Sequence, residues 1–300
     1  MSDFLDALRE LPLLRYALLM GVLTSVACGV IGTYVVTRRI TSIAGAVAHC
    51  VLGGLGAAKY YQVTHGWTWC HPLLGAAVAA VLSALIIGWV SLRAKEREDT
   101  VISSIWSVGM AIGVLYISRT PGYSEDLTSY LFGNILLVTW SDVLMVALLD
   151  VVILGVAVTC YHKLLAVCFD EEFARLRGLR VEAYYLMLLA LTALTVVVLL
   201  KVVGIIMVIA LLTLPAATAG YFSRTLVHMM ALATLIGVGL TSGGLVLSFG
   251  PNLPVGATTI LLAGGVYLAA MGWRGIVGRL GREGREGEQV SRGEGERGSG

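Results

Sequence analysis

Long apolar segments constrain this chain more than any other feature of its sequence. A helix that crosses a membrane needs about 20 mostly apolar residues, because its backbone polar groups must bond to one another inside the lipid. We identify about nine such runs, with eight to ten possible, separated by short breaks that carry charges, proline or glycine. They cover residues 16–37, 43–62, 72–92, 101–118, 142–161, 183–200, 202–222, 226–248 and 255–273. The run 183–222 is nearly continuous, and Lys201 marks the predicted interruption.

The composition excludes several classes of protein. Hydrophobic residues make up 57% of the 300 residues and charged residues only 13%, about half the charged share of a soluble domain. A chain this apolar cannot cover its own surface in water, which excludes a soluble enzyme, a disordered protein and a nucleic-acid binder. The sequence therefore predicts an all-α polytopic membrane protein surrounded by lipid, with residues 1–280 forming one transmembrane domain.

Lysine and arginine residues predict the orientation, because they are enriched in cytoplasmic loops. They concentrate in alternate loops, for example in 93–97 and 163–180, whereas the opposite loops 63–71 and 249–254 contain none. With nine spans, this pattern places the N-terminus outside the cell (inner) membrane and the C-terminus in the cytoplasm. Residues 281–300 consist mostly of Gly, Arg and Glu, which predicts a disordered cytoplasmic tail.

The longest cytoplasmic connection, residues 169–181, predicts a short and well-capped helix. An aspartate suits its N-cap, two glutamates occupy the first turn, where the helix dipole favours anions, and arginines occupy the last turn. A glycine follows that can take the left-handed conformation at the helix end. The apolar side chains of this helix would dock either into a partner protein or onto lipid headgroups. The residues concerned are Asp170, Glu171, Glu172, Phe173, Arg175, Leu176 and Gly178.

The stretch FDEEFARLRGL resembles the coupling helix in permease subunits of the metal-ion ABC transporter family, which take up zinc, manganese or iron. Residues 97–115, 126–143, 194–219 and 253–262 also match that family, in the same order. The resemblance implies a type II ABC importer-like permease that forms a homodimer. It also implies cytosolic ABC ATPase subunits, in which the coupling helix sits, and an extracytoplasmic metal-binding protein that docks on the outer face.

The absence of nucleotide-binding and hydrolase motifs agrees with a transport subunit. No GxxxxGK[ST] motif occurs, so this chain has no P-loop with which to bind ATP itself. Neither HExxH nor GxSxG occurs. The sequence thus predicts no enzyme activity and no bound cofactor, with ATP used by the partner subunit. Two competing hypotheses remain, a secondary transporter driven by a proton or sodium gradient and a membrane scaffold that transports nothing.

His49 is the leading candidate for the metal path, because ionisable residues inside spans are costly and usually functional. Neutral imidazole suits zinc, manganese or iron, and the neighbouring Cys50 adds a thiolate that favours zinc. Adjacent helical residues point about 100° apart, so one ion reaches both only if the helix is distorted. In the family an aspartate usually lies four residues earlier on the same face, where this chain has Gly45. His49 is therefore a ligand in a weaker or shared site, or a packing residue bonded to a neighbouring helix.

Two further groups offer metal ligands. Asp150, near the middle of the span 142–161, either replaces the missing carboxylate or accepts hydrogen bonds from another helix. The outer loop contains His65, Cys70 and His71, which either receive an ion from a binding protein or belong to an aromatic anchor at the headgroup level.

Together these observations predict the membrane-spanning subunit of an ATP-driven importer of divalent transition metal ions. The thiol of Cys50 leans the choice of metal towards zinc, with manganese and iron as the other candidates.

Overall fold

The computed structural model describes residues 12–67, 69–93, 98–121, 138–251 and 253–275. The predicted tail at 281–300 lies outside these residues. All regular secondary structure in the described part of the chain is helical, as the apolar runs predict.

The helices follow the apolar runs closely. They are α2 (Pro12–Thr37), α3 (Thr41–His65), α4 (Pro72–Arg93), α5 (Glu98–Ser118), α7 (Trp140–Thr159), α8 (Tyr161–Phe169), α9 (Glu171–Leu176), α10 (Val181–Val203), α11 (Ile205–Phe222) and α12 (Leu226–Phe249). A C-terminal helix covers Val255–Gly275.

The number of spans is consistent with the prediction from the sequence. Eight described helices are long and apolar enough to cross a membrane, and α11 is a shorter apolar helix that corresponds to the ninth run. The interruption between α10 and α11 lies at Gly204, not at Lys201 as expected. Gly204 has φ 80° and ψ 166°, a conformation that glycine adopts without the steric cost of a side chain. A charged residue does not by itself end a helix, and α10 continues through Lys201 to Val203.

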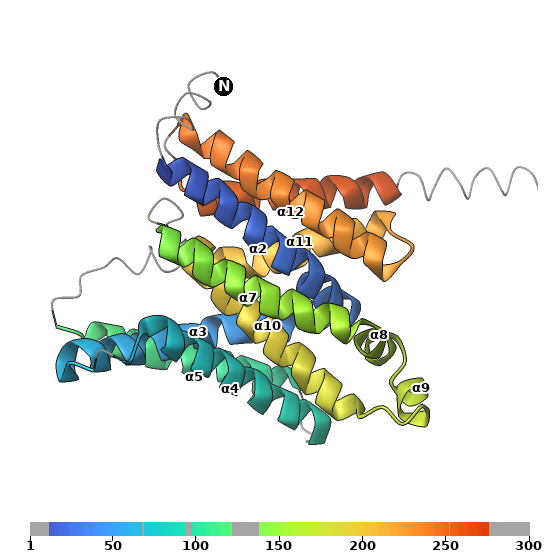
Figure 1. Cartoon of the computed structure of the whole chain (residues 1–300), viewed down its shortest axis with the longest axis horizontal. Coiled ribbons are helices and arrows are strands. Elements are labelled where there is room, and N and C mark those ends of the chain that lie inside the picture. The colour runs from blue at the N-terminus through green and yellow to red at the C-terminus, as the bar shows by residue number, and fades with distance from the viewer. Residues whose placement is uncertain (1–11, 68, 94–97, 122–137, 252, 276–300) are drawn as a thin grey trace, which may run out of the picture.

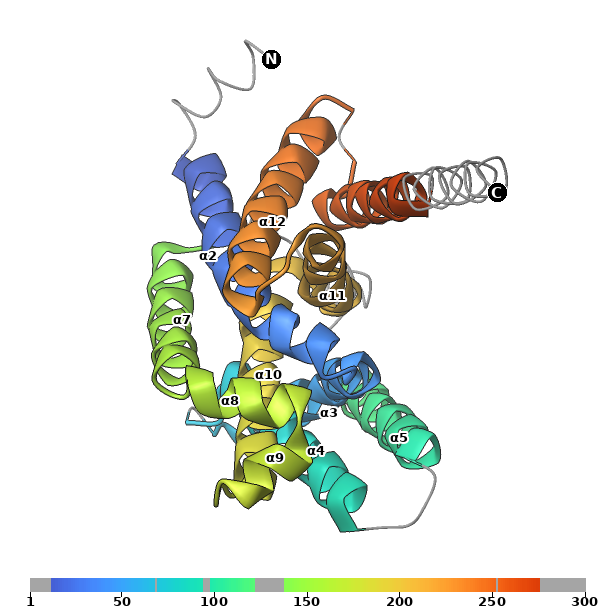
Figure 2. The same ribbon diagram turned by 90° about the vertical axis from the view of Figure 1, so that its right-hand side faces the viewer.

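The helices form two groups joined by α10 (Figure 1). Helices α3, α4 and α5 pack together in one group, and α2, α7, α11 and α12 lie in the other. α10 lies between the groups and packs against both. The short helices α8 and α9 lie at the end of the bundle where α10 begins (Figure 2). α10 therefore connects this end of the bundle with both groups.

Close helix packing places α3 at the centre of its group. A Cβ atom added at Gly53 would lie 2.8 Å from the carbonyl oxygen of Gly109 in α5, and one at Gly56 would lie 2.8 Å from that of Gly113. Small residues allow such close approach of helix backbones within a membrane. As a result, 72% of the span of α3 is buried, compared with 17% of the span of α5.

We expect Gly53→Ala to destabilise the protein by about 1–3 kcal/mol, because the methyl group would push against the backbone of α5. Gly45→Ala is the matched control in the same helix, since a Cβ there would meet Ile209 Cδ1 at an ordinary 3.6 Å. Thermal unfolding in detergent should show a lower melting temperature for Gly53→Ala only. Equal melting temperatures for the two variants would contradict the packing argument.

Candidate functional site

His49 lies in the first half of α3 and is held by an aromatic contact with α5. Its ring stacks on the indole of Trp106, with centroids 4.3 Å apart and planes inclined by 13°. Its Nδ1 atom is buried and has no hydrogen-bond partner among the described residues. Buried polar atoms are normally paired, so a histidine that only fastened two helices through this nitrogen would have a partner there. The ring is thus fixed in place while one nitrogen remains unused.

A cavity of about 490 Å³ borders the same region of α3. Gly45 lines it together with Trp106, the residue on which His49 stacks. Residues four apart on a helix share a face, so His49 and Gly45 are neighbours on the surface of α3. Hydroxyl groups from α3, α11 and the C-terminal helix also line the cavity, and they belong to Thr41, Ser42, Thr213 and Tyr267. His49 does not itself line the cavity, but it stacks on Trp106, which does.

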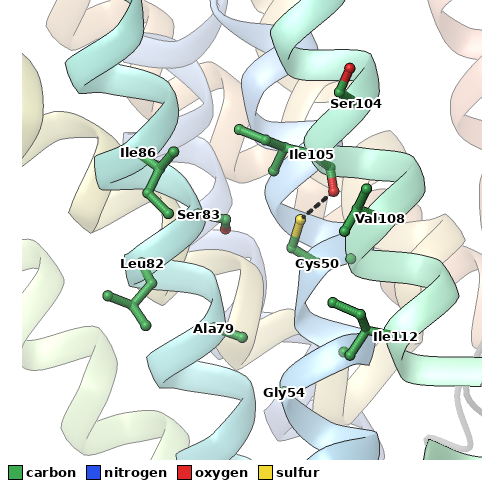
Figure 3. Close-up of a pocket in the computed structure, with 12 residues that line it drawn as sticks. Cys50, Gly54, Ala79, Leu82, Ser83, Ile86, Ser104, Ile105, Val108 and Ile112 are labelled. Atoms are coloured by element: carbon green, nitrogen blue, oxygen red, sulfur yellow. Dashed lines mark hydrogen bonds between the residues drawn. The ribbon is translucent and has the colours of Figure 1, made fainter. Parts of the chain in front are cut away.

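Cys50 contributes to a different groove, as its neighbouring position on the helix predicts. Its Sγ donates a hydrogen bond of 3.2 Å to the carbonyl oxygen of Ile105. The thiol lies between α3, α4 and α5 and lines a groove of about 490 Å³ that also includes Ser83 and Ser104 (Figure 3). Apart from the thiol and these two hydroxyls, the groove is lined by alkyl side chains and glycines. Cys50 and His49 thus belong to separate surroundings in this structure.

Asp150 is a buried carboxyl group in the other group of helices. Its side chain is 3% exposed, and neither carboxylate oxygen has a hydrogen-bond partner among the described residues. Cys28 of α2 lies within electrostatic range of it. α7, which carries Asp150, packs mainly against α2, whereas α3 packs mainly against α4 and α5. Within the described residues, no three His, Cys, Asp or Glu side chains form a group that could hold a metal ion.

The candidate ligands of the outer loop belong to two local arrangements. The ring of His65, the last residue of α3, lies among aromatic rings, 5.4 Å from Tyr61 and 5.8 Å from Trp67. Trp67 stacks on Trp69 at 5.5 Å, and both indoles are exposed. The Nδ1 atom of His71 accepts a hydrogen bond of 3.3 Å from the backbone N–H of Leu73. The loop before α4 has the composition of an aromatic anchor at a membrane surface.

The segment after α8 forms the short helix α9 that its sequence predicts. The carboxylate of Asp170 accepts a hydrogen bond of 2.9 Å from the backbone N–H of Phe173, and the acidic first turn of α9 follows. Gly178 ends the helix with φ 75°. The N–H groups of Gly178 and Leu179 bond to the carbonyls of Arg175 and Ala174, which is a Schellman ending.

α9 turns apolar side chains outward. Phe173 is 48% exposed and Leu176 is 88% exposed, and Phe169 at the end of α8 is also exposed. On the inner side, Ala174 is buried against Val167 and Val181, which attaches α9 to α8 and α10. Burial also raises the pKa of the nearby Cys168 thiol to about 11, so this cysteine stays neutral at pH 7 and is a poor metal ligand. α9 is therefore anchored through one face and free to dock through the other.

The fold is that of a polytopic membrane protein with eight helices, among the described residues, that are long and apolar enough to cross a membrane, and known proteins are similar to this chain over most of its length. The chain is 41% identical, over 256 residues, to a "Probable metal transport system membrane protein" of Chlamydia trachomatis, and the match covers 85% of this chain and 87% of that protein. It is 32% identical to the "Manganese transport system membrane protein MntC" of Listeria monocytogenes, and the match covers 89% of this chain and 92% of that protein. The structure of PsaBC from Streptococcus pneumoniae in complex with Fab matches with a TM-score of 0.80 and 28% identity, covering 90% of this chain and 94% of that chain.

The ABC 3 transport family matches residues 10–274, and this chain belongs to that family. It is accordingly a permease of the metal-transport type, and not itself an enzyme. This membership confirms the resemblance seen in the ordered sequence motifs.

Two residues of the site were not identified from the sequence. Trp106 lies in a stretch that carried the family resemblance, but its contact with His49 depends on which faces of α3 and α5 meet. Arg38, between the first two predicted spans, is one of the basic residues whose alternation served only to predict the orientation, yet the structure places it against α9. Its position in the short connection between two spans was a signal that its side chain could reach other elements at that end of the helices.

Proposed function

We propose that this chain is the membrane-spanning subunit of an ATP-driven importer of divalent transition metal ions. It works as a homodimer, accepts the ion from an extracytoplasmic metal-binding protein and is driven by cytosolic ABC ATPase subunits. The observation that carries the proposal is the Nδ1 atom of His49, which is buried without a hydrogen-bond partner among the described residues, on a ring that stacks on Trp106 at the edge of a cavity. His49 binds the ion transiently, because an ion held too tightly would not leave.

The surface of α5 supports a second copy of the chain as the partner. Exposed serines occur on this span, namely Ser103, Ser104 and Ser107, and small residues of this kind are enriched where helices meet within a membrane. Trp106 is 38% exposed on the same helix. A second copy facing α5 would cover these residues and bring a second His49 towards the first. Two imidazoles, water and hydroxyls would then complete a site that one copy leaves incomplete.

The exposed face of α9 supports docking to an ATPase. Phe173 and Leu176 project from a helix that is anchored on its other side, as a helix seated in a groove of another protein would require. ATP-driven closure of two ATPases would move α9 in each copy and switch the central path between the two sides of the membrane. The gradient-driven alternative provides no use for this helix.

Manganese is the first candidate for the transported ion and zinc the second. The leaning towards zinc depended on the thiolate of Cys50, and in this structure that thiol bonds to Ile105 in another groove. Imidazole with hydroxyl and water oxygens suits manganese as well as zinc. The relative from Listeria monocytogenes that is named as a manganese transport protein adds support for manganese.

We place the protein in the cell (inner) membrane. The proposed orientation has α8 and α9 in the cytoplasm and the aromatic loop before α4 outside. The C-terminal helix ends on the same side of the bundle as α9 (Figure 1), which supports a cytoplasmic tail.

Co-purification followed by reconstitution tests this proposal. The tagged chain, purified in mild detergent and placed in liposomes, should bring with it an ATPase and take up manganese only when ATP is hydrolysed. Leu176→Asp should lose the ATPase, because it places a charge on the most exposed apolar side chain of α9 while touching no core residue. Arg224→Glu, in another exposed loop, is the control that should keep it. A chain that repeatedly purifies alone and transports on a proton or sodium gradient would contradict the proposal.

A further inference from the structure

The turn between α2 and α3 is unusually well defined. Arg39 has φ 61°, which is uncommon for a residue other than glycine. Two hydrogen bonds hold it, from Arg39 N–H to the Val36 carbonyl at 3.1 Å and from Ile40 N–H to the Val35 carbonyl at 3.0 Å. This is a Schellman ending that leads directly into α3. A force applied at this turn therefore passes to the first turn of α3 and is not absorbed by a flexible loop.

Arg38 extends from this turn to two other elements. Its guanidinium forms an ion pair with Glu171, the first residue of α9. It also lies over the ring of Tyr185 in α10, 5.6 Å from the ring centroid. The hydroxyl of Tyr185 in turn lies 3.5 Å from that of Ser91 in α4. One side chain thus connects the turn before α3 to the start of α9 and to the first two turns of α10.

The ion pair fixes the position of α9 relative to the turn before α3 more than it stabilises the fold. The side chains of Arg38 and Glu171 are 24% and 32% exposed, and ion pairs in contact with water stabilise a fold only slightly. The buried contacts of Ala174 with Val167 and Val181 already hold α9 to its neighbours. Loss of the pair should therefore leave the fold and the docking face of α9 intact while removing its link to α3.

We propose that Arg38 is a positioning residue that transmits movement of α9 to the metal-binding region of α3. The proposal rests on the function proposed above. When the ATPase moves α9, Glu171 carries the guanidinium of Arg38 with it, and the rigid turn shifts the start of α3. His49 lies about 12 Å further along the helix, at 1.5 Å per residue, and moves with it as one rigid segment.

The test measures the number of manganese ions transported per ATP hydrolysed by the intact complex in liposomes. For Arg38→Gln we expect this ratio to fall about fivefold or more, the lower end of typical coupling between linked sites. The ATPase should still co-purify, and the melting temperature should not change. Arg39→Gln is the matched control, because it removes the adjacent exposed charge and leaves the ion pair. The double variant Arg38→Glu with Glu171→Arg should recover most of the ratio, because it restores the pair with reversed charges.

Three results would overturn the role of Arg38. They are an unchanged ratio in Arg38→Gln, loss of the ATPase from that variant, and a ratio in the double variant no higher than in Arg38→Glu or Glu171→Arg alone. The last result would show that the ion pair between Arg38 and Glu171 does not contribute to transport. A wild-type complex that takes up neither manganese nor zinc with ATP would overturn the proposed function itself, which keeps the two failures distinguishable.

Discussion

Replacing His49 by alanine is expected to abolish ATP-dependent metal uptake while the complex with its ATPase stays assembled. The change removes the imidazole whose Nδ1 has no other partner, together with the ring that stacks on Trp106. We expect a loss of at least about 100-fold, because even residues that only support a metal ligand contribute about 10–100-fold. Uptake of radioactive manganese into liposomes that contain the co-purified complex measures the effect.

Cys50→Ala is the matched control, since it alters the next residue of the same helix. The thiol bonds to Ile105 and lines the groove between α3, α4 and α5, so its removal should change uptake little. Both variants should retain the ATPase on purification, which separates a transport defect from misfolding. Normal uptake by His49→Ala would exclude the imidazole as an essential ligand. A large loss in Cys50→Ala would favour a site that includes the thiol, and with it zinc.

Gly45→Asp is expected to create a tighter metal site than the wild-type chain has. The new carboxylate would lie one turn from His49 on the same helix face, where two ligands can share an ion. The site has room, because a Cβ at Gly45 would lie 3.6 Å from Ile209 Cδ1 and 3.9 Å from Trp106 Cζ3, both ordinary contacts. We expect at least about a tenfold gain in manganese affinity, equivalent to about 1.4 kcal/mol. Equilibrium dialysis of the purified chain measures it.

Two further variants show whether the gain comes from a shared site. Gly45→Asn has nearly the same shape without the charge, and it should bind manganese no better than the wild type. Adding His49→Ala to Gly45→Asp should remove most of the gain, because the carboxylate would then act alone. Tighter binding should also slow release and lower the rate of uptake. Equal affinities for the aspartate and asparagine variants would show that the side chain at position 45 does not reach the ion.

Much of the fold follows from physical rules that act locally along the chain. Apolar length alone predicts the spans, because backbone groups in lipid leave no alternative to helices. The capping of α9 follows from Asp170 and Gly178, whose preferences operate over a few residues. The prediction placed the break before α11 at Lys201 because this residue is charged. The break lies instead at Gly204, whose backbone conformation separates the two helices.

The site was less predictable, because it depends on contacts between distant segments. His49 stood out as an ionisable residue in a span, and helix geometry indicated that Cys50 could share its ion only if the helix were distorted. Neither argument identifies Trp106 as the stacking partner, since this depends on the glycine contacts that set how α3 and α5 meet. The pairing of Arg38 with Glu171 likewise joins residues far apart in sequence, and charge alone leaves their partners open.

The position of His49 along α3 has an electrical consequence. In the proposed orientation α3 runs from Thr41 at the cytoplasmic side to His65 outside, so His49 lies about two thirds of the way inward, at 1.5 Å per residue. A divalent cation that reaches it from outside has crossed most of a membrane potential that is negative inside. Each 100 mV then favours loading by about 3 kcal/mol for two charges. The voltage across the membrane would thus help to fill the proposed site, which has few ligands, and would oppose the return of the ion.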